Sequence, residues 1–230
     1  MKPSFLVWSL AALLTAPLSA VASEAMWRVQ GSIDVVEGAA VPGGINVGDA
    51  FSVVLHFDTD APVTNPSVCG DGGVGTLCRH NGDPAMYYSD IQLGSLFVPS
   101  FSGSAGDQST IVRNNAPDPA FGDTVDGYTF GVRRFNDASE NTNAQVLLRG
   151  PEDLDVVTDG RILPAVPPAG LMSLRSRVFE VCDSQVDFDC YHFYLSGTIN
   201  SIVAVPEPET LALMFAGLGV VAFSARRQKR

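Results

Sequence analysis

Apolar and polar side chains alternate along three segments of the chain, and this alternation predicts β-strands. The segments are residues 27–35, 51–57 and 191–199. A period of two places alternate side chains on opposite faces of a sheet, so each predicted strand has one buried face and one wetter face. Between residues 23 and 204 no stretch shows a convincing helical period. The central part of the chain is therefore expected to be β-structure.

Shorter apolar runs extend this prediction over the rest of the central region. Further candidate strands lie at residues 86–98, 127–135, 145–149 and 172–182. Segments rich in Gly, Pro and Asn separate them, at residues 41–44, 81–84 and 114–117. Many short strands with such turns favour an antiparallel β-sandwich, with a jelly roll or a barrel as the alternative. We predict an all-β fold with a single sandwich domain over residues 23–204.

The N-terminus has the layout of a secretory signal peptide. Lys2 precedes an apolar stretch over residues 5–14, and Ala20 and Ala22 supply the small residues that a signal peptidase recognises. The apolar stretch is too short to span a bilayer. We predict that residues 1–22 are removed after export, with a cut after Ala25 as the alternative.

A second apolar run lies at the C-terminus. Residues 211–225 carry no charge, and a basic tail follows that comprises Arg226, Arg227, Lys229 and Arg230. As a helix this run would span roughly 22 Å, short of the ~30 Å hydrocarbon core of a bilayer. The positive-inside rule keeps the basic tail on the cytoplasmic side. We expect a short apolar helix that holds the chain in the inner membrane transiently, with an ordinary single-span anchor as the alternative.

The residues just before this run carry a family resemblance. Val205, Pro206, Glu207 and Pro208 precede the apolar run, and with the basic tail the segment 205–230 resembles a PEP-CTERM sorting signal. The resemblance implies a Gram-negative bacterium, recognition of the Pro-Glu-Pro element by an exosortase, and delivery to the cell surface or extracellular matrix. It covers the tail alone and says nothing about the fold of the body.

The charge distribution excludes one class of partner. The chain has 14 Lys and Arg against 25 Asp and Glu, and its 17% charged residues lie below the roughly 25% usual for soluble domains. Between Ser23 and Val205 there are nine basic residues, all Arg, against 23 acidic ones. Because such an acidic body is repelled by phosphate backbones, no nucleic-acid partner is expected.

The four cysteines fit an oxidising compartment. Cys69 and Cys78 bound one short segment, and Cys182 and Cys190 bound another. Four cysteines allow three pairings, and the local one is favoured because each bond would close a short loop rich in Gly or Asp. Each disulfide would stabilise the fold by roughly 2–3 kcal/mol. A zinc site is not expected, because no two cysteines have the short spacing that zinc sites use.

Acidic loops make Ca²⁺ the one candidate metal. Asp-rich segments lie at residues 58–60, 118–119, 123–126, 153–155 and 183–189. Oxygen-rich loops on secreted β-domains can bind Ca²⁺. None of these loops has the ligand order of an EF-hand, and Asp is common in turns for its local hydrogen bonds. We predict no metal site and no cofactor.

No sequence motif points to catalysis. His56 and His192 fall on the polar faces of predicted strands, and His80 lies in the loop region after Cys69. The chain has no Gly-x-Ser-x-Gly elbow, His-Glu-x-x-His pair or Gly-rich phosphate loop. Sets of Ser, His and Asp, or pairs of carboxylates, can be chosen freely from any chain of this size, so they carry no weight.

Three tyrosines raise a carbohydrate-binding alternative. Tyr87, Tyr88 and Tyr128 lie near predicted turns, where exposed rings would stack on sugars, whereas packing in the sandwich core is the other interpretation. We predict a secreted, non-catalytic protein with a structural role at the cell surface or in the exopolysaccharide matrix of a biofilm. The alternatives are a carbohydrate-binding or adhesive module, with or without Ca²⁺, and a secreted hydrolase. The expected partners are an exosortase, signal peptidase and exopolysaccharide.

Overall fold

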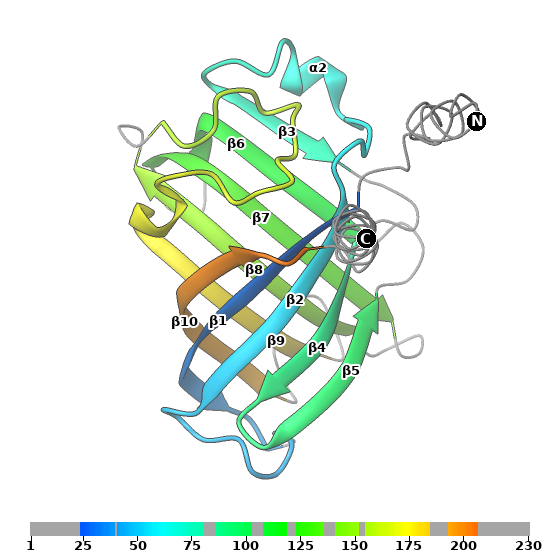
Figure 1. Ribbon diagram of the computed structural model, residues 1–230, viewed down its shortest axis with the longest axis vertical. Coiled ribbons are helices and arrows are strands. Elements are labelled where there is room, and N and C mark those ends of the chain that lie inside the picture. The colour runs from blue at the N-terminus through cyan, green and yellow to red at the C-terminus, as the bar shows by residue number, and fades with distance from the viewer. Residues whose placement is uncertain are drawn as a thin grey trace, which may run out of the picture.

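In the part of the chain that the structure describes, ten β-strands make up almost all of the regular structure (Figure 1). The computed structural model describes residues 24–39, 41–80, 86–102, 108–118, 123–135, 141–151, 155–184 and 193–206. The strands are β1 (Glu24–Glu37), β2 (Ala50–Asp58), β3 (Thr76–His80), β4 (Tyr87–Leu93), β5 (Leu96–Ser102), β6 (Gln108–Asp118), β7 (Asp123–Phe135), β8 (Asn141–Pro151), β9 (Ser176–Ser184) and β10 (Phe193–Ala204). The helical turns are α2 (Pro66–Cys69) and η2 (Leu171–Ser173).

All ten strands belong to one antiparallel sheet. Their order is β3-β6-β7-β8-β9-β10-β1-β2-β4-β5. Apart from β3, each half of the sheet follows the order of the chain, and the last strand pairs with the first. This up-and-down order differs from the Greek-key connections of a jelly roll. The prediction of an all-β, antiparallel fold is confirmed.

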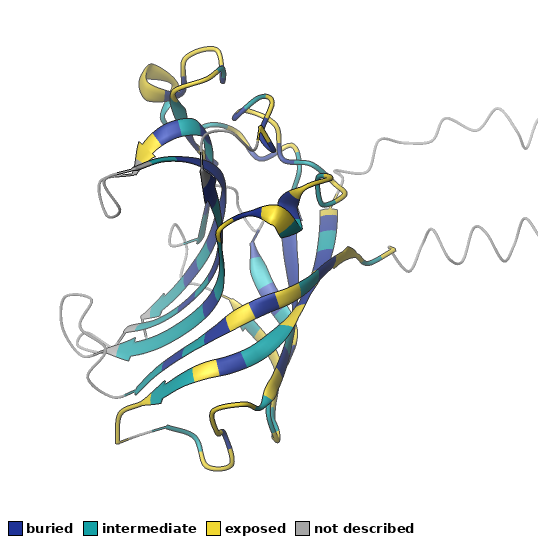
Figure 2. Cartoon of the chain, turned by 90° about the vertical axis from the view of Figure 1, so that its left-hand side faces the viewer, coloured by how far each residue is buried: buried dark blue, intermediate teal, exposed yellow. Residues whose placement is uncertain are grey.

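The sheet bends so that its two halves face each other, as the layers of a sandwich do (Figure 2). The ring of Phe51 on β2 stacks on that of Phe179 on β9, with ring centroids 4.9 Å apart. Two glycines make room for Phe51, because a Cβ at Gly31 or Gly197 would lie 2.6 or 2.9 Å from its ring. The core is therefore enclosed between two halves of one sheet.

Trp27 occupies the centre of one end of this core. Its ring is fully buried and makes edge-on contacts with Phe57, Tyr128 and Phe130, at centroid distances of 5.2, 6.2 and 5.4 Å. The indole Nε1 donates a hydrogen bond to the carbonyl oxygen of Ala165, 3.0 Å away. The buried polar atom of the tryptophan is thus satisfied, which this residue type requires inside a core.

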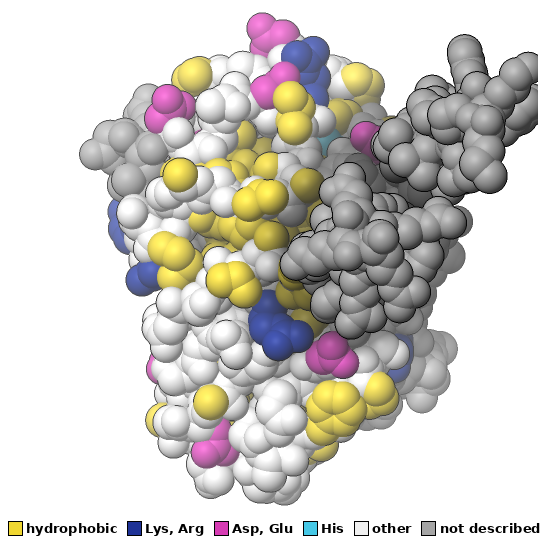
Figure 3. Space-filling view, in the orientation of Figure 1, with side chains coloured by type: hydrophobic (Ala, Val, Ile, Leu, Met, Phe, Trp, Pro, Cys, Tyr) yellow, Lys and Arg dark blue, Asp and Glu magenta, His cyan; other side chains and the backbone are white. Residues whose placement is uncertain are grey.

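Residues 155–175, called here the covering segment, lie over the same end of the core. They connect β8 to β9 and bury the side chains of Val156, Val157, Leu163, Leu171 and Leu174. On the outer side of the covering segment, Ile162 and Val166 are 58% and 65% exposed. Apolar side chains gather on this face of the molecule (Figure 3). The covering segment therefore completes the core that the bent sheet leaves open at this end.

The regular alternation of the sequence identified its strands correctly. The predicted strands at residues 27–35, 51–57 and 127–135 lie within β1, β2 and β7. On β2 the predicted inward residues Phe51, Val53, Leu55 and Phe57 are all buried. The predicted strand at residues 191–199 corresponds to β10, whose described part begins at Phe193.

Three predicted elements were wrong in their extent or type. The strand expected at residues 172–182 begins only at Ser176, as β9, because residues 171–173 form the turn η2. Residues 86–98 were expected to form one strand, but they contain β4 and the start of β5, joined by a turn in which Gly94 has a φ of 57°. Residues 114–117 were expected to form a turn, but they lie inside β6. The pairing of β6 with β7 shifts between Arg113 and Ala116, and Asn115 has a φ of 46°. The Asn residues therefore form a β-bulge.

Candidate functional site

The last strand leads directly into the predicted sorting motif. β10 ends at Ala204, and the backbone N–H of Val205 donates to the carbonyl oxygen of Met26 on β1, 2.8 Å away. Pro206 follows, is exposed, and has no N–H with which to extend the ladder. Sheet pairing therefore stops where the motif starts. Glu207, Pro208, the predicted apolar helix and the basic tail lie outside the described residues.

The first described residues lie at the same end of the sheet as the motif. Trp27 on β1 is paired with Ala204 on β10, and Glu24 is paired with Asp58 on β2. The predicted cleavage residues Ala20 and Ala22 lie outside the described residues. Since β1 and β10 are antiparallel neighbours, the chain enters and leaves the folded body side by side. In the described part of the chain, no helix has the length and apolar character needed to cross a bilayer.

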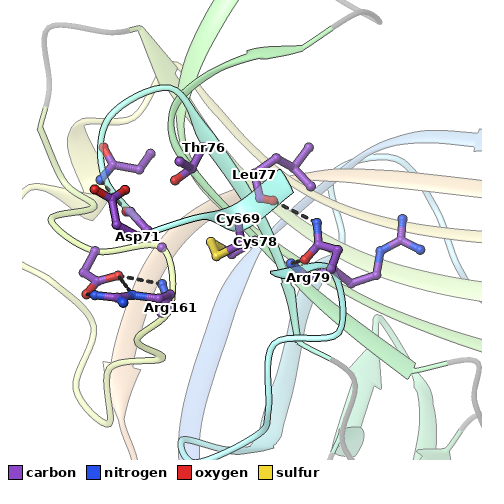
Figure 4. The surroundings of a disulfide bond; sticks show 12 residues. Cys69, Asp71, Thr76, Leu77, Cys78, Arg79 and Arg161 are labelled. Carbon is purple, nitrogen blue, oxygen red and sulfur yellow. Dashed lines mark hydrogen bonds and ion pairs between the residues drawn. A yellow bond between two sulfur atoms is a disulfide. The ribbon is translucent and has the colours of Figure 1, made fainter. Parts of the chain in front are cut away.

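A disulfide fastens the edge of the sheet near this end (Figure 4). Cys69, at the end of α2, is bonded to Cys78 on β3, and both are buried. The side chain of Asn65 ties the same two elements together: its Nδ2 donates to the Leu77 carbonyl at 2.9 Å, and its Oδ1 accepts from the Arg79 N–H at 2.7 Å. The predicted local pairing of Cys69 with Cys78 is confirmed, and it rules out both crossed alternatives.

The second predicted disulfide is only half within the described residues. Cys182 on β9 is disulfide-bonded. Its predicted partner Cys190 lies outside the described residues, as does His192. All three cysteines in the described part of the chain are therefore held in disulfide bonds.

His80 is buried between β3 and the covering segment. Its Nδ1 lies 2.9 Å from the carbonyl oxygen of Ala61, and its Nε2 lies 2.9 Å from that of Gly160. Each ring nitrogen of His80 thus lies within hydrogen-bond distance of a backbone carbonyl oxygen. The sequence placed His80 in a loop region, but it is the last residue of β3 and joins that strand to the covering segment.

Asp126 joins the other side of the covering segment to β7. It is fully buried, and its Oδ2 accepts hydrogen bonds from the backbone N–H groups of Val156 and Val157, the latter at 2.8 Å. Its Oδ1 has no hydrogen-bond partner. Burial raises the pKa of this carboxyl above its ordinary value, and the nearby charge of Asp155 raises it further, while the backbone hydrogen bonds oppose the shift. Asp126 thus has a structural role.

Three polar side chains on β1, β2 and β4 form a hydrogen-bonded line that the sequence did not predict. The Nδ1 of His56 lies 2.6 Å from Glu24 Oε1, and its Nε2 lies 2.8 Å from Ser89 Oγ. The ring of Tyr87 stacks on His56 with centroids 4.1 Å apart, and its hydroxyl donates to Glu24 at 3.2 Å. We call Ser89, His56 and Glu24 the polar trio.

The polar trio has the order of groups found in a nucleophile, base and acid relay. An ionised Glu24 accepts from Nδ1, which leaves Nε2 able to accept the hydroxyl proton of Ser89. The trio lies outside the apolar core cluster, on the other face of the strands from Leu55 and Tyr88. Asp90, next to Ser89, has a φ of 49° where β2 and β4 shift register. The backbone beside the hydroxyl therefore departs from a regular ladder.

The other residues singled out by the sequence have structural positions. Tyr88 and Tyr128 are buried, so they pack in the core and form no exposed platform for sugars. The ring of Tyr87 stacks on that of His56. Asp58 Oδ1 accepts from the backbone N–H of Asp60 at 2.8 Å, as in an ordinary turn. Among the described residues, no three His, Cys, Asp or Glu side chains gather as metal ligands would.

Comparison with known proteins identifies the C-terminal segment. Residues 204–229 match the family model of the PEP-CTERM protein-sorting motif. No curated protein and no solved structure matches the chain. The chain therefore carries a PEP-CTERM sorting motif at its C-terminus, attached to an all-β body. This motif indicates a protein that is exported, processed by an exosortase and sorted to the cell envelope.

Proposed function

We propose that this chain is a non-catalytic structural protein of the cell surface or exopolysaccharide matrix of a Gram-negative bacterium. The observation that carries the proposal is the position of the sorting motif, which starts at Ala204, the last residue of β10. The folded body and the signal thus adjoin without a linker. After cleavage near Pro206 the product would be the folded body alone, displayed by its β1 and β10 end.

The chemistry of the body supports a structural role outside the cytoplasm. A buried disulfide closes the edge of the sheet, and such bonds persist in oxidising compartments. The segment between Ser23 and Val205 has an excess of 14 acidic residues, which favours solubility and disfavours adsorption to anionic surfaces by charge alone. Retention at the envelope is therefore proposed to come from processing of the C-terminus.

Replacing the motif tests this proposal. In the native host, exchange of Pro206, Glu207 and Pro208 for Ala should leave protein that keeps its C-terminal tail in the inner membrane, because the exosortase no longer recognises it. The variant Glu209→Ala lies just outside the Pro-Glu-Pro element and should be processed normally. Normal surface delivery of the triple variant would contradict the proposal. Export through the N-terminal signal should be unchanged in both variants.

A secreted hydrolase is the second candidate function, and the polar trio is the observation that favours it. Incubation of the exported protein with a fluorophosphonate probe tests whether Ser89 Oγ is nucleophilic. A nucleophilic Ser89 would be labelled covalently, and labelling would disappear in His56→Gln as well as in Ser89→Ala. The matched control is Ser52→Ala, on the same sheet outside the trio. Failure of Ser89 to react would leave the non-catalytic proposal standing.

A further inference from the structure

An apolar cavity lies inside the bent sheet at the end that the covering segment does not close. Its volume is ≈ 160 Å³. The lining comes from both halves of the sheet, and its residues are Pro42, Tyr88, Ile91, Leu93, Leu96, Val98, Phe101, Thr142, Ala144, Phe179, Val181, Phe193 and Leu195. We propose that this cavity is a binding site for an uncharged hydrocarbon group of about six carbons, either a free small molecule or the end of an alkyl chain.

The cavity follows from the local geometry of the β4–β5 hairpin. The bulge at Asp90 lets Tyr88, Ile91 and Leu93 all face the interior, although Tyr88 and Ile91 are three residues apart. The paired strand β5 adds Leu96 and Val98 beside them. On the opposite half, Thr142 and Ala144 of β8 are small. Large side chains therefore line the wall formed by β4 and β5. The facing half contributes Phe179, Val181, Phe193 and Leu195 from β9 and β10, and the small Thr142 and Ala144 beside them leave space unfilled.

The lining offers almost no polar group to a ligand or to water. The lining has two side-chain hydroxyls, and both donate elsewhere: that of Tyr88 to the carbonyl oxygens of Phe130 and Ala144 at 2.9 and 3.3 Å, and that of Thr142 to Asp183. A water molecule needs two to four polar partners to remain in a cavity. An apolar cavity of about 150 Å³ in another protein stays dry and binds benzene or xenon. The volume and lining of this cavity therefore match a hydrocarbon of that size.

The charged groups beside the lining do not select an ion. Arg134 lies over the ring of Phe101 with its guanidinium carbon 4.8 Å from the centroid, and its Nε donates to the Ser102 carbonyl at 3.1 Å. Asp183 accepts from the hydroxyl of Thr142, which is the cross-strand partner of Arg134, at 3.3 Å. One charge of each sign thus borders the cavity. An uncharged group is favoured, and a polar end of a longer chain could lie among these side chains.

The cavity is distant from the end of the body that carries the sorting motif. Phe193 and Leu195, at the start of β10, line it, whereas Val205 follows the end of the same strand. At about 3.3 Å per residue, the ten steps along the chain from Leu195 to Val205 span roughly 33 Å. The site would therefore stay accessible while the chain is held at its C-terminus, and the inference does not depend on the proposed function.

Nuclear magnetic resonance of the exported protein tests the inference, with benzene as the first probe. In benzene-saturated buffer the methyl resonances of Ile91, Val181 and Leu195 should shift, while those of Val29 and Val157 should not. Octanol as competitor distinguishes the two ligand sources. Displacement of benzene by octanol would assign the site to an alkyl chain end, and binding of benzene without displacement would assign it to a free small molecule.

Two variants make the result specific to the cavity. Ala144→Leu fills the space and should weaken benzene binding by about tenfold or more without loss of stability, whereas the same change at Ala116, which is buried away from the cavity, should destabilise the fold by overpacking. If Ala144→Leu does not fold, Leu195→Ala should enlarge the site and admit p-xylene. Unshifted lining resonances in the wild-type protein, or equal shifts in Ala144→Leu, would overturn the proposal.

Discussion

The hydroxyl of Tyr88 on β4 donates a hydrogen bond to the carbonyl oxygen of Phe130 on β7, 2.9 Å away across the core. These strands belong to opposite halves of the bent sheet. Burial raises the pKa of Tyr88 far above its ordinary value, so the hydroxyl remains a donor at all physiological pH values. One side chain thus joins the two facing halves by a directional contact in addition to apolar packing.

Removal of this hydroxyl should destabilise the fold. Tyr88→Phe keeps the ring but removes the donor to two buried carbonyl oxygens, and loss of a buried hydrogen-bond partner costs about 1–3 kcal/mol. Chemical unfolding in urea measures the effect. Tyr87→Phe is the matched control, because that half-exposed hydroxyl makes one contact with an exposed Glu24. Equal stability of Tyr88→Phe and the wild-type protein would contradict the assigned role.

Loss of the Cys69–Cys78 disulfide should loosen one edge of the sheet. The bond closes a short loop, for which the chain-entropy relation gives roughly 2–3 kcal/mol. In the double variant Cys69→Ser and Cys78→Ser, hydrogen exchange should rise most in β3 and α2, because β3 is an edge strand with β6 as its neighbour in the sheet and a single bridge, from His80 to Val63, on its other side. Exchange that rises first in β1 and β2 would show that the bond acts elsewhere.

Asp126 should give the stability of the fold a specific dependence on pH. Its carboxyl has a pKa raised above 3.8, mainly by burial. Between pH 3.8 and this raised pKa, the folded state therefore binds more protons than the unfolded state. The stabilisation from the protonated form is complete below 3.8 and is lost as the pH rises through the raised pKa. Asp126→Asn should remove this decline, and the exposed control Asp60→Asn should not. Unfolding curves across pH 3–8 measure the difference, and parallel profiles for wild type and Asp126→Asn would refute the assignment.

Retention at the cell surface should survive removal of divalent cations. If the processed C-terminus is joined covalently to an envelope component, EDTA and moderate salt should release little protein, since screening acts on charge pairs and leaves covalent bonds intact. Immunoblots of washed cells and supernatants measure retention. Quantitative release by EDTA would instead favour a Ca²⁺-dependent adhesive module, with Ca²⁺ bridging the Asp-rich loops to acidic sugars.

The alternation of side chains predicted the fold class because it is a local property. On β2 the inward residues Phe51 and Leu55 follow the period of two from end to end, so the strand could be recognised without knowledge of its neighbours. β3 has five residues and β6 contains an Asn bulge, so neither shows a clean period. The hairpin at Gly94 was missed because apolar residues continue on both sides of the turn.

The sites of the body could not be predicted because they depend on register. Glu24, His56 and Ser89 meet only because β1 pairs with β2 and β2 pairs with β4, with a shift beside Asp90. Ala144 borders a cavity only because the sheet bends β8 toward β4. The sorting motif consists of consecutive residues and does not depend on strand pairing. The sequence alone was therefore sufficient to predict it.

Intact-mass measurement of the mature protein from the native host tests the central claim most directly. Sorting by an exosortase predicts two cuts, one near Ala22 and one at or near residues 206–208, so that the polypeptide begins close to Ser23 and ends close to Pro206. A mature envelope species that still carries Arg226, Arg227, Lys229 and Arg230 would contradict the account.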